Sequence, residues 1–209
     1  MENYDLNLLK NQLQQDLQKQ LVSSRSLLDR FCVIDEASRK SPAYLDPNFA
    51  SFYYHLGKYI KPKYMIEFGF DLGLLSGCFL TSCKAVEGFL GFREKSKEFA
   101  SVRLGRQNIK KSCKGERNFY IGEIYDQEFE SLFNLHSWDL AIFTDEGKYD
   151  KHLGYYDFIW SRMNDNGIIV AEYVGRHAPA KDAYFAFCKS KNREPLIFKT
   201  RYGTGLIQK

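Results

Sequence analysis

The first hydrophobic pattern along the chain is a set of leucines spaced three or four positions apart between residues 4 and 22. This spacing places the leucines on one face of a helix, and most of the other positions are Gln, Asn, Asp and Lys. A narrow apolar stripe on a polar helix must be buried, either against its own domain or against a second copy of the protein. Both alternatives are open from sequence, and the second predicts a homodimer. The stripe consists of Leu6, Leu9, Leu13, Leu17 and Leu21.

From residue 49 onward, helical segments alternate with short apolar strands. Alternation of this kind favours a mainly parallel sheet covered by helices on both faces. The Tyr-Gly-Thr-Gly sequence at 202–205 favours an antiparallel hairpin at the end. We therefore predict an α/β, Rossmann-like domain over 49–209, preceded by an N-terminal helical extension over 1–48. The predicted strands are 64–68, 88–92, 118–121, 138–144, 167–173, 196–200 and 206–208, and the predicted helices are 49–60, 74–83, 96–111, 127–133, 151–163 and 179–191.

Composition agrees with a folded domain and narrows the range of partners. Of the 209 residues, 44% are hydrophobic, which is enough for a buried core. The net charge is only +4, so the basic stretch at 103–114 is expected to be a solvated helix face and no nucleic-acid partner is expected. The N-terminus is polar and no apolar run reaches about 18 residues, so neither a signal peptide nor a membrane helix is expected. The five cysteines form no CxxC pair, which favours reduced thiols and a cytoplasmic location.

Candidate chemistry follows the first strand, where residues 66–73 read Ile-Glu-Phe-Gly-Phe-Asp-Leu-Gly. This is an acid-x-Gly-x-x-x-Gly pattern, unlike the GxGxxG of dinucleotide-binding proteins, so nicotinamide-dependent oxidoreduction is disfavoured. Ligands of open α/β sheets lie beyond the carboxyl ends of the strands, and glycines there let the backbone approach the ligand. At these residues the sequence resembles the class I S-adenosylmethionine-dependent methyltransferases. The resemblance implies an S-adenosylmethionine site formed by Glu67, Gly69, Asp71, Gly73, Glu94 and Glu123.

The resemblance also implies a role for most of these positions. Glu67 orients the loop and the amino group of the cofactor, and the two glycines shape the pocket for its methionine part. The family has an acid that binds the ribose at the end of the second strand. Here Arg93 stands in that place and Glu94 follows it. The Ile-Gly-Glu sequence that ends at Glu123 resembles the family's step near the adenine.

A second resemblance lies after the fourth and fifth predicted strands. Asp145 to Lys148, followed by Glu172 and Tyr173, is similar to the cation-dependent O-methyltransferases of the caffeoyl-CoA and catechol type. Those enzymes carry Asp-x-x-Lys after the fourth strand and Asp-Asn after the fifth. The resemblance implies that Asp145 and Glu172 bind Mg²⁺ or another divalent cation, and that Lys148 is a general base. Tyr173 replaces the metal-binding Asn, and a phenol is a poorer ligand for Mg²⁺ than an amide oxygen.

The expected function is therefore methyl transfer from S-adenosylmethionine to the hydroxyl group of a small molecule. The region before residue 64 is expected to form an additional wall of the acceptor pocket. The alternative is a catalytically inactive protein of the same fold that acts as a binding or assembly module. Arg93 and Tyr173 favour that alternative, whereas the complete acid-x-Gly-x-x-x-Gly motif, Asp145 and Lys148 favour the enzyme.

Overall fold

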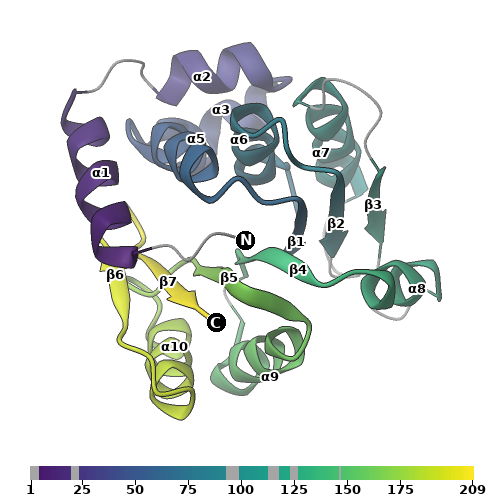
Figure 1. The fold of residues 1–209 in the computed structure, drawn as a ribbon. Helices are drawn as coiled ribbons and strands as arrows, with labels where there is room; N and C mark the ends of the chain where they lie inside the picture. Colours follow the sequence, from purple (N-terminus) through teal and green to yellow (C-terminus); the bar gives the residue numbers. More distant parts are fainter. Residues whose placement is uncertain (1–4, 20–23, 93–98, 113–117, 123–126, 146) are drawn as a thin grey trace.

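A single sheet forms the centre of the molecule. The structure is a computed structural model that describes residues 5–19, 24–92, 99–112, 118–122, 127–145 and 147–209. In these ranges seven strands lie in the order β3-β2-β1-β4-β5-β7-β6 (Figure 1). Strands β3, β2, β1, β4 and β5 are parallel to one another, whereas β7 is antiparallel to both β5 and β6. This confirms the predicted mostly parallel sheet with a C-terminal antiparallel hairpin. The strands are β1 (Tyr64–Phe68), β2 (Gly88–Phe92), β3 (Asn118–Gly122), β4 (Trp138–Phe143), β5 (Met163–Ala171), β6 (Leu196–Phe198) and β7 (Thr204–Gln208).

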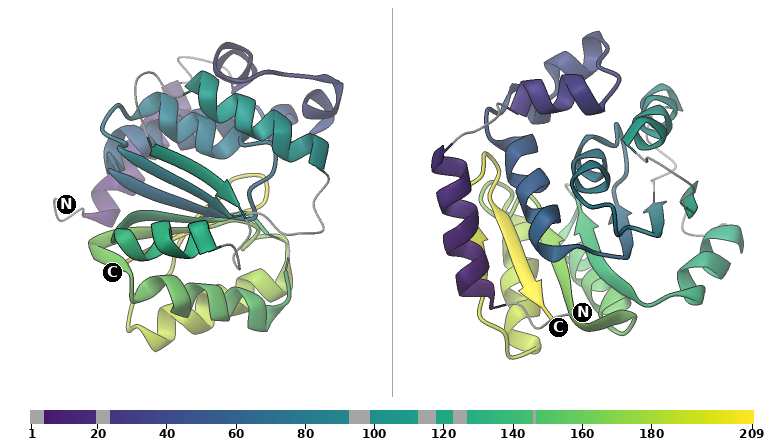
Figure 2. Two further views of the ribbon diagram at one scale, coloured as in Figure 1. Left: turned by 90° about the vertical axis from the view of Figure 1, so that its right-hand side faces the viewer. Right: turned by 45° about the horizontal axis from the view of Figure 1, so that its top comes forward.

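Helices cover both faces of the sheet, as the view along its edge shows (Figure 2). One face carries α5 (Phe49–Ile60), α6 (Leu74–Ser82) and α7 (Phe99–Ser112). The other face carries α8 (Gln127–Leu135), α9 (Tyr149–Trp160) and α10 (Ala178–Ser190). The N-terminal segment adds α1 (Leu6–Lys19), α2 (Ser24–Phe31), α3 (Glu36–Lys40) and α4 (Pro42–Leu45).

Each central strand supplies side chains to two separate cores. Successive residues of a strand point to opposite faces of the sheet. In β4, Leu140 and Ile142 pack into the core under α5 and α6, while Ala141 and Phe143 pack into the core that contains residues of α8, α9 and α10. Strands buried on both faces read as nearly continuous apolar runs, which explains why the sequence pattern identified them.

The leucine stripe of α1 packs on the chain's own domain. Leu9 and Leu13 are 3% and 0% exposed and belong to the same core as residues of α5 and α6. The hydroxyl of Tyr59 on α5 also donates a hydrogen bond to Asp16 Oδ2 on α1, at 2.7 Å. For these leucines the first of the two alternatives is therefore confirmed, while Leu21 lies outside the described residues.

Several predicted boundaries differ from the structure, and the largest difference lies between α9 and β5. The predicted helix at 151–163 ends at Trp160, and the strand predicted to start at 167 already begins at Met163. Met163 pairs with Trp138 on β4, and the register then shifts before Leu140 pairs with Ile168. The polar Asn-Asp-Asn-Gly sequence at 164–167 therefore lies inside an irregular strand and does not form a turn that precedes it.

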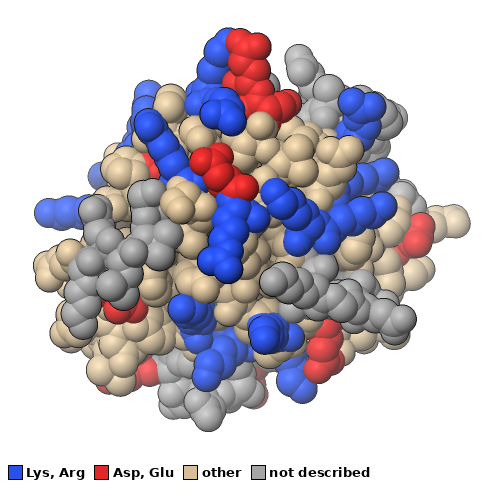
Figure 3. All heavy atoms as spheres, turned by 90° about the horizontal axis from the view of Figure 1, so that it is seen from above, with Lys and Arg blue, Asp and Glu red and all other residues tan. Residues whose placement is uncertain are grey.

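Basic side chains are spread over the face of the molecule that carries α2 and α7, with acidic side chains among them (Figure 3). Two members of the predicted basic stretch are used within the fold. Arg106 Nη2 donates to the carbonyl of Ile121 at 2.9 Å, and Lys111 Nζ donates to the carbonyl of Cys32 at 2.7 Å. In the described part of the chain, the helices are too short or too polar to cross a membrane.

Candidate functional site

A cavity of about 170 Å³ lies at the carboxyl ends of β1, β4 and β5. The loop that follows β1 forms one wall of it, with Glu67, Gly69, Asp71 and Gly73. These are four of the six residues predicted to bind the cofactor. The other two, Glu94 and Glu123, lie outside the described residues, as does Arg93.

Glu67 is the fourth residue of β1 and its carboxylate is held in place from two sides. It is 3% exposed. The hydroxyl of Ser76 on α6 donates to Oε2, and the hydroxyl of Thr144 after β4 donates to Oε1 at 3.4 Å. A buried carboxylate needs such donors because desolvation without them is costly. The two donors fix the orientation of the Glu67 side chain beside the glycine loop.

The two glycines of the motif adopt backbone conformations that other residues rarely take. Gly69 has φ +92° and Gly73 has φ +65°. A Cβ atom on Gly69 would lie 2.9 Å from the hydroxyl oxygen of Thr144, and one on Gly73 would lie 3.0 Å from the carbonyl oxygen of Gly105. Glycine is therefore required at both positions by the packing of the loop as well as by its turn.

Asp71 has a buried oxygen without a hydrogen-bond partner. Its Oδ1 atom is inaccessible to solvent and receives no hydrogen bond from any described residue. Buried carboxylate oxygens in folded proteins are almost always hydrogen-bonded, so an unsatisfied one on a residue that lines a cavity favours a donor on a ligand or water. Asp71 therefore identifies a place on this wall where a cationic or N–H-bearing group would be stabilised.

The opposite wall is built from loops at the ends of β5 and β6. It contains Glu172, Tyr173 and Tyr202. Thr204 donates a hydrogen bond to Glu172 Oε1 at 2.7 Å. Burial raises the pKa of Glu172 to about 8, against the lowering effect of that hydrogen bond, and nearby Asp46 raises it further. Glu172 is therefore mostly protonated at neutral pH.

The N-terminal segment completes the cavity. Ser41, Ala43 and Phe49 line it, from the loop and helices that precede β1. This agrees with the prediction that the region before residue 64 adds a wall to the pocket.

The two residues predicted to bind a metal are not brought together at this cavity, because Glu172 lines it and Asp145 does not. The Asp145 carboxylate forms an ion pair with Lys151, and Asp145 is not among the residues that line the cavity. Lys148 is the N-cap residue of α9, and its side chain is exposed. Among the described residues, no three His, Cys, Asp or Glu side chains form a group that could hold a metal ion.

Sequence reasoning missed Lys151, Thr204 and Tyr202. Burial lowers the pKa of Lys151, which lies one helical turn after the predicted base, Lys148. The Asp-x-x-Lys pattern selects Lys148 by its spacing from Asp145, and no motif in the sequence points to Lys151. The roles of Thr204 and Tyr202 depend on the insertion of β7 beside β5, a long-range pairing that local sequence does not encode.

Comparison with known proteins supports the fold. No protein-family model matches the sequence, and no curated protein matches it at a significant level. Among solved structures, the O-methyltransferase of Bacillus cereus in complex with SAH superposes with a TM-score of 0.61 at 13% identity, over 89% of this chain and 96% of that one. A Staphylococcus aureus protein provisionally assigned as a caffeoyl-CoA O-methyltransferase gives 0.64 at 12% identity, over 96% and 99%. The SAM complex of an O-methyltransferase from Streptomyces achromogenes gives 0.59 at 10% identity, over 88% and 93%. The chain therefore has the class I methyltransferase fold.

Proposed function

We propose that this chain is an S-adenosylmethionine-dependent methyltransferase that methylates a hydroxyl group of a small molecule. One observation carries the proposal: the glycine loop after β1 and the residues after β5 line the same cavity. In this fold, the glycine loop supports binding of the cofactor, and the residues after β5 support binding of an acceptor beside the cofactor. The similarity to O-methyltransferase structures supports the choice of oxygen as the methyl acceptor.

The cofactor wall fits a cationic ligand. S-adenosylmethionine, when bound, supplies an electrophilic methyl group and carries an ammonium group. Glu67 and Asp71 present carboxylates to the cavity, and Asp71 Oδ1 has no donor from the described residues. A charge-assisted hydrogen bond from an ammonium group would satisfy that atom.

The acceptor wall offers a proton acceptor. Glu172 Oε1 is occupied by Thr204, but Oε2 receives no hydrogen bond from the described residues. A carboxylate whose pKa is raised to about 8 is a stronger base than an ordinary one and operates close to neutral pH. Once ionised, Glu172 would take the proton of an acceptor hydroxyl on Oε2, while Phe49 and Ala43 help to exclude water.

The side chains present do not fit the divalent-cation site that the sequence resemblance implies. Asp145 is neutralised by Lys151, and Glu172 is mostly protonated and bonded to Thr204. Mg²⁺ requires several ionised or strongly polar oxygen ligands in a near-octahedral arrangement. The proposal therefore assigns no step to a metal, and Lys148, with its exposed side chain, has a weaker claim to the role of base than Glu172.

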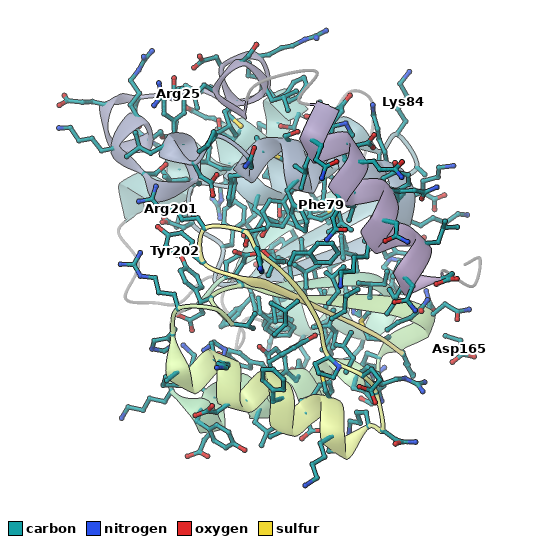
Figure 4. All side chains as sticks on the ribbon, turned by 90° about the vertical axis from the view of Figure 1, so that its left-hand side faces the viewer. Arg25, Phe79, Lys84, Asp165, Arg201 and Tyr202 are labelled. Atoms are coloured by element: carbon teal, nitrogen blue, oxygen red, sulfur yellow. The ribbon has the colours of Figure 1, made fainter. Side chains whose placement is uncertain are left out.

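The test is a calorimetric titration of the full chain with S-adenosylhomocysteine. We expect binding by the wild type, and about tenfold weaker binding by Asp71→Asn, because a charge-assisted hydrogen bond is replaced by a neutral one. Asp165→Asn is the matched control, since Asp165 is exposed on the opposite side of the molecule from Tyr202 (Figure 4). Absence of binding by the wild type would reject the proposal and favour the inactive binding or assembly module.

A further inference from the structure

Two loops, residues 172–177 after β5 and residues 199–203 between β6 and β7, contribute Glu172, Tyr173 and Tyr202 to the acceptor side of the cavity. We refer to the two loops together as the rim. They are fastened to each other by backbone contact. Gly175 N donates to the carbonyl of Tyr202 at 2.8 Å. A Cβ atom on Gly203, which has φ +75°, would lie only 2.4 Å from Gly175 N. Because only glycine permits this approach, the two loops form one rigid wall.

Aromatic and cationic side chains are stacked on this wall. The rings of Tyr173 and Tyr202, which both line the cavity, have centroids 5.0 Å apart. The guanidinium carbons of Arg176 and Arg201 lie 5.3 and 5.7 Å from the centroid of the Tyr202 ring. Figure 4 shows Arg201 and Tyr202 together on one side of the molecule. Each loop thus contributes one tyrosine to the stack and one arginine beside it.

The charge of the rim is not balanced from within. Residues 172–177 and 199–203 contain Arg176, His177, Lys199 and Arg201, and their one acidic residue is Glu172. Both arginines are exposed, and neither forms an ion pair with any described residue. Three acidic side chains line the cavity. Glu67 and Asp71 are on the cofactor wall, and burial raises the pKa of Glu172, on the acceptor wall, to about 8, so it carries little charge at neutral pH. The cavity therefore has an acidic side suited to a cationic cofactor and a basic rim on the acceptor side.

We propose that the methyl acceptor is a planar hydroxyl compound that carries an anionic group, a carboxylate or a phosphate, held by Arg176 and Arg201 while its ring packs on Tyr173 and Tyr202. A guanidinium group binds the paired oxygens of either anion in a matching planar geometry. Stacking on Tyr202 limits the motion of both guanidinium groups, so less conformational entropy is lost when the anion binds. This inference rests on the proposed function, because it names the class of acceptor for the same cavity.

The test compares three probes by calorimetry on the full chain, with and without saturating S-adenosylhomocysteine. The probes are catechol, 3,4-dihydroxybenzoate and 3,4-dihydroxyphenyl phosphate. We expect at least one anionic probe to bind about fivefold or more tightly than catechol, in line with a net gain from charge-assisted hydrogen bonds. The probe whose affinity exceeds that of catechol shows whether the site binds a carboxylate or a phosphate.

Variants test whether Arg176 and Arg201 cause the preference for the anionic probe. In the double variant Arg176→Gln/Arg201→Gln, we expect the anionic probe to bind no more than about twofold better than catechol, as for a screened surface charge. Lys84→Gln is the control, because Lys84 is an exposed cation on the far side of the molecule (Figure 4). Equal binding of all three probes to the wild type, absence of binding by both anions, or a preference that survives in the double variant would overturn the inference. Failure of S-adenosylhomocysteine to bind would instead reject the proposed function and with it the role of acceptor, and the probe preference measured without it would then show only whether the two arginines select an anionic ligand.

Discussion

The hydroxyl of Thr204 donates a hydrogen bond to Glu172 Oε1 at 2.7 Å, joining the first residue of β7 to the residue that follows β5. The same hydroxyl lies 3.1 Å from the phenol oxygen of Tyr53 on α5 and 2.8 Å from the hydroxyl of Thr200. Thr204 is fully buried and Glu172 is 5% exposed. The carboxyl group is thus fixed by a polar network that links three elements of the fold at the edge of the cavity.

The raised pKa of Glu172 leads to a prediction of how the stability of the protein depends on pH. Burial raises its pKa from 4.5 to about 8. Folding then favours the protonated form, so the contribution of this group to stability is complete below about pH 4.5 and is lost as pH rises toward and through pH 8. One pKa unit corresponds to about 1.4 kcal/mol, so we expect the free energy of unfolding to decrease by about 2 kcal/mol or more between pH 5 and pH 8.5 because of this residue.

The measurement is urea unfolding of the wild type and Glu172→Gln at several pH values. The glutamine variant keeps the shape of the side chain but cannot ionise, so its stability should depend much less on pH in this window. Glu36→Gln is the matched control, because Glu36 is an exposed carboxylate in a surface pair with Lys40. Parallel pH curves for the wild type and Glu172→Gln would show that Glu172 titrates normally.

Much of the fold was predictable because its strands are buried on both faces. The strand at 88–92 was predicted with its observed bounds, and 64–68 likewise, since both are short apolar runs that end at polar or glycine residues. The region 1–48 was predicted to be helical, but the separate helices between residues 24 and 45 were not predicted, because each is only four to eight residues long. Their burial depends on contacts with α5 and α6 that are distant in sequence.

The candidate site was predictable on one wall only. Glu67, Gly69, Asp71 and Gly73 lie close together in the sequence, so one local motif brings all four to the cavity. On the other wall, Glu172 was found by its place after a strand, but its environment was not. Whether a carboxylate binds a metal or holds a proton depends on its neighbours, here Thr204 and Asp46, which no spacing rule reveals.

The second prediction is that divalent cations do not stabilise the protein. If Asp145 is held by Lys151 and Glu172 is protonated, Mg²⁺ has no set of ligands to bind. A ligand at 100 times its dissociation constant stabilises a protein by about 2.7 kcal/mol, which a melting curve detects easily. We therefore expect the thermal midpoint to be the same in MgCl₂, in MnCl₂ and in EDTA at matched ionic strength. A rise in the midpoint with either cation that Asp145→Ala abolishes would restore the predicted metal site.

The last prediction concerns the leucine stripe of α1. The homodimer predicted from the stripe stays a prediction, but Leu13 is fully buried in the chain's own core, whereas Leu8 on the same helix is 55% exposed. Removing a buried leucine side chain costs about 2–5 kcal/mol, and removing an exposed one changes stability by about 0.5 kcal/mol or less. We therefore expect Leu13→Ala to lower the free energy of unfolding by about 2 kcal/mol or more and Leu8→Ala to have little effect. Because Leu13 packs within one chain, its effect should not depend on protein concentration, and light scattering should report the same mass for both variants. An unfolding midpoint that rises with protein concentration, together with a mass near twice 24.4 kDa that Leu13→Ala reduces, would show that the stripe also serves a dimer.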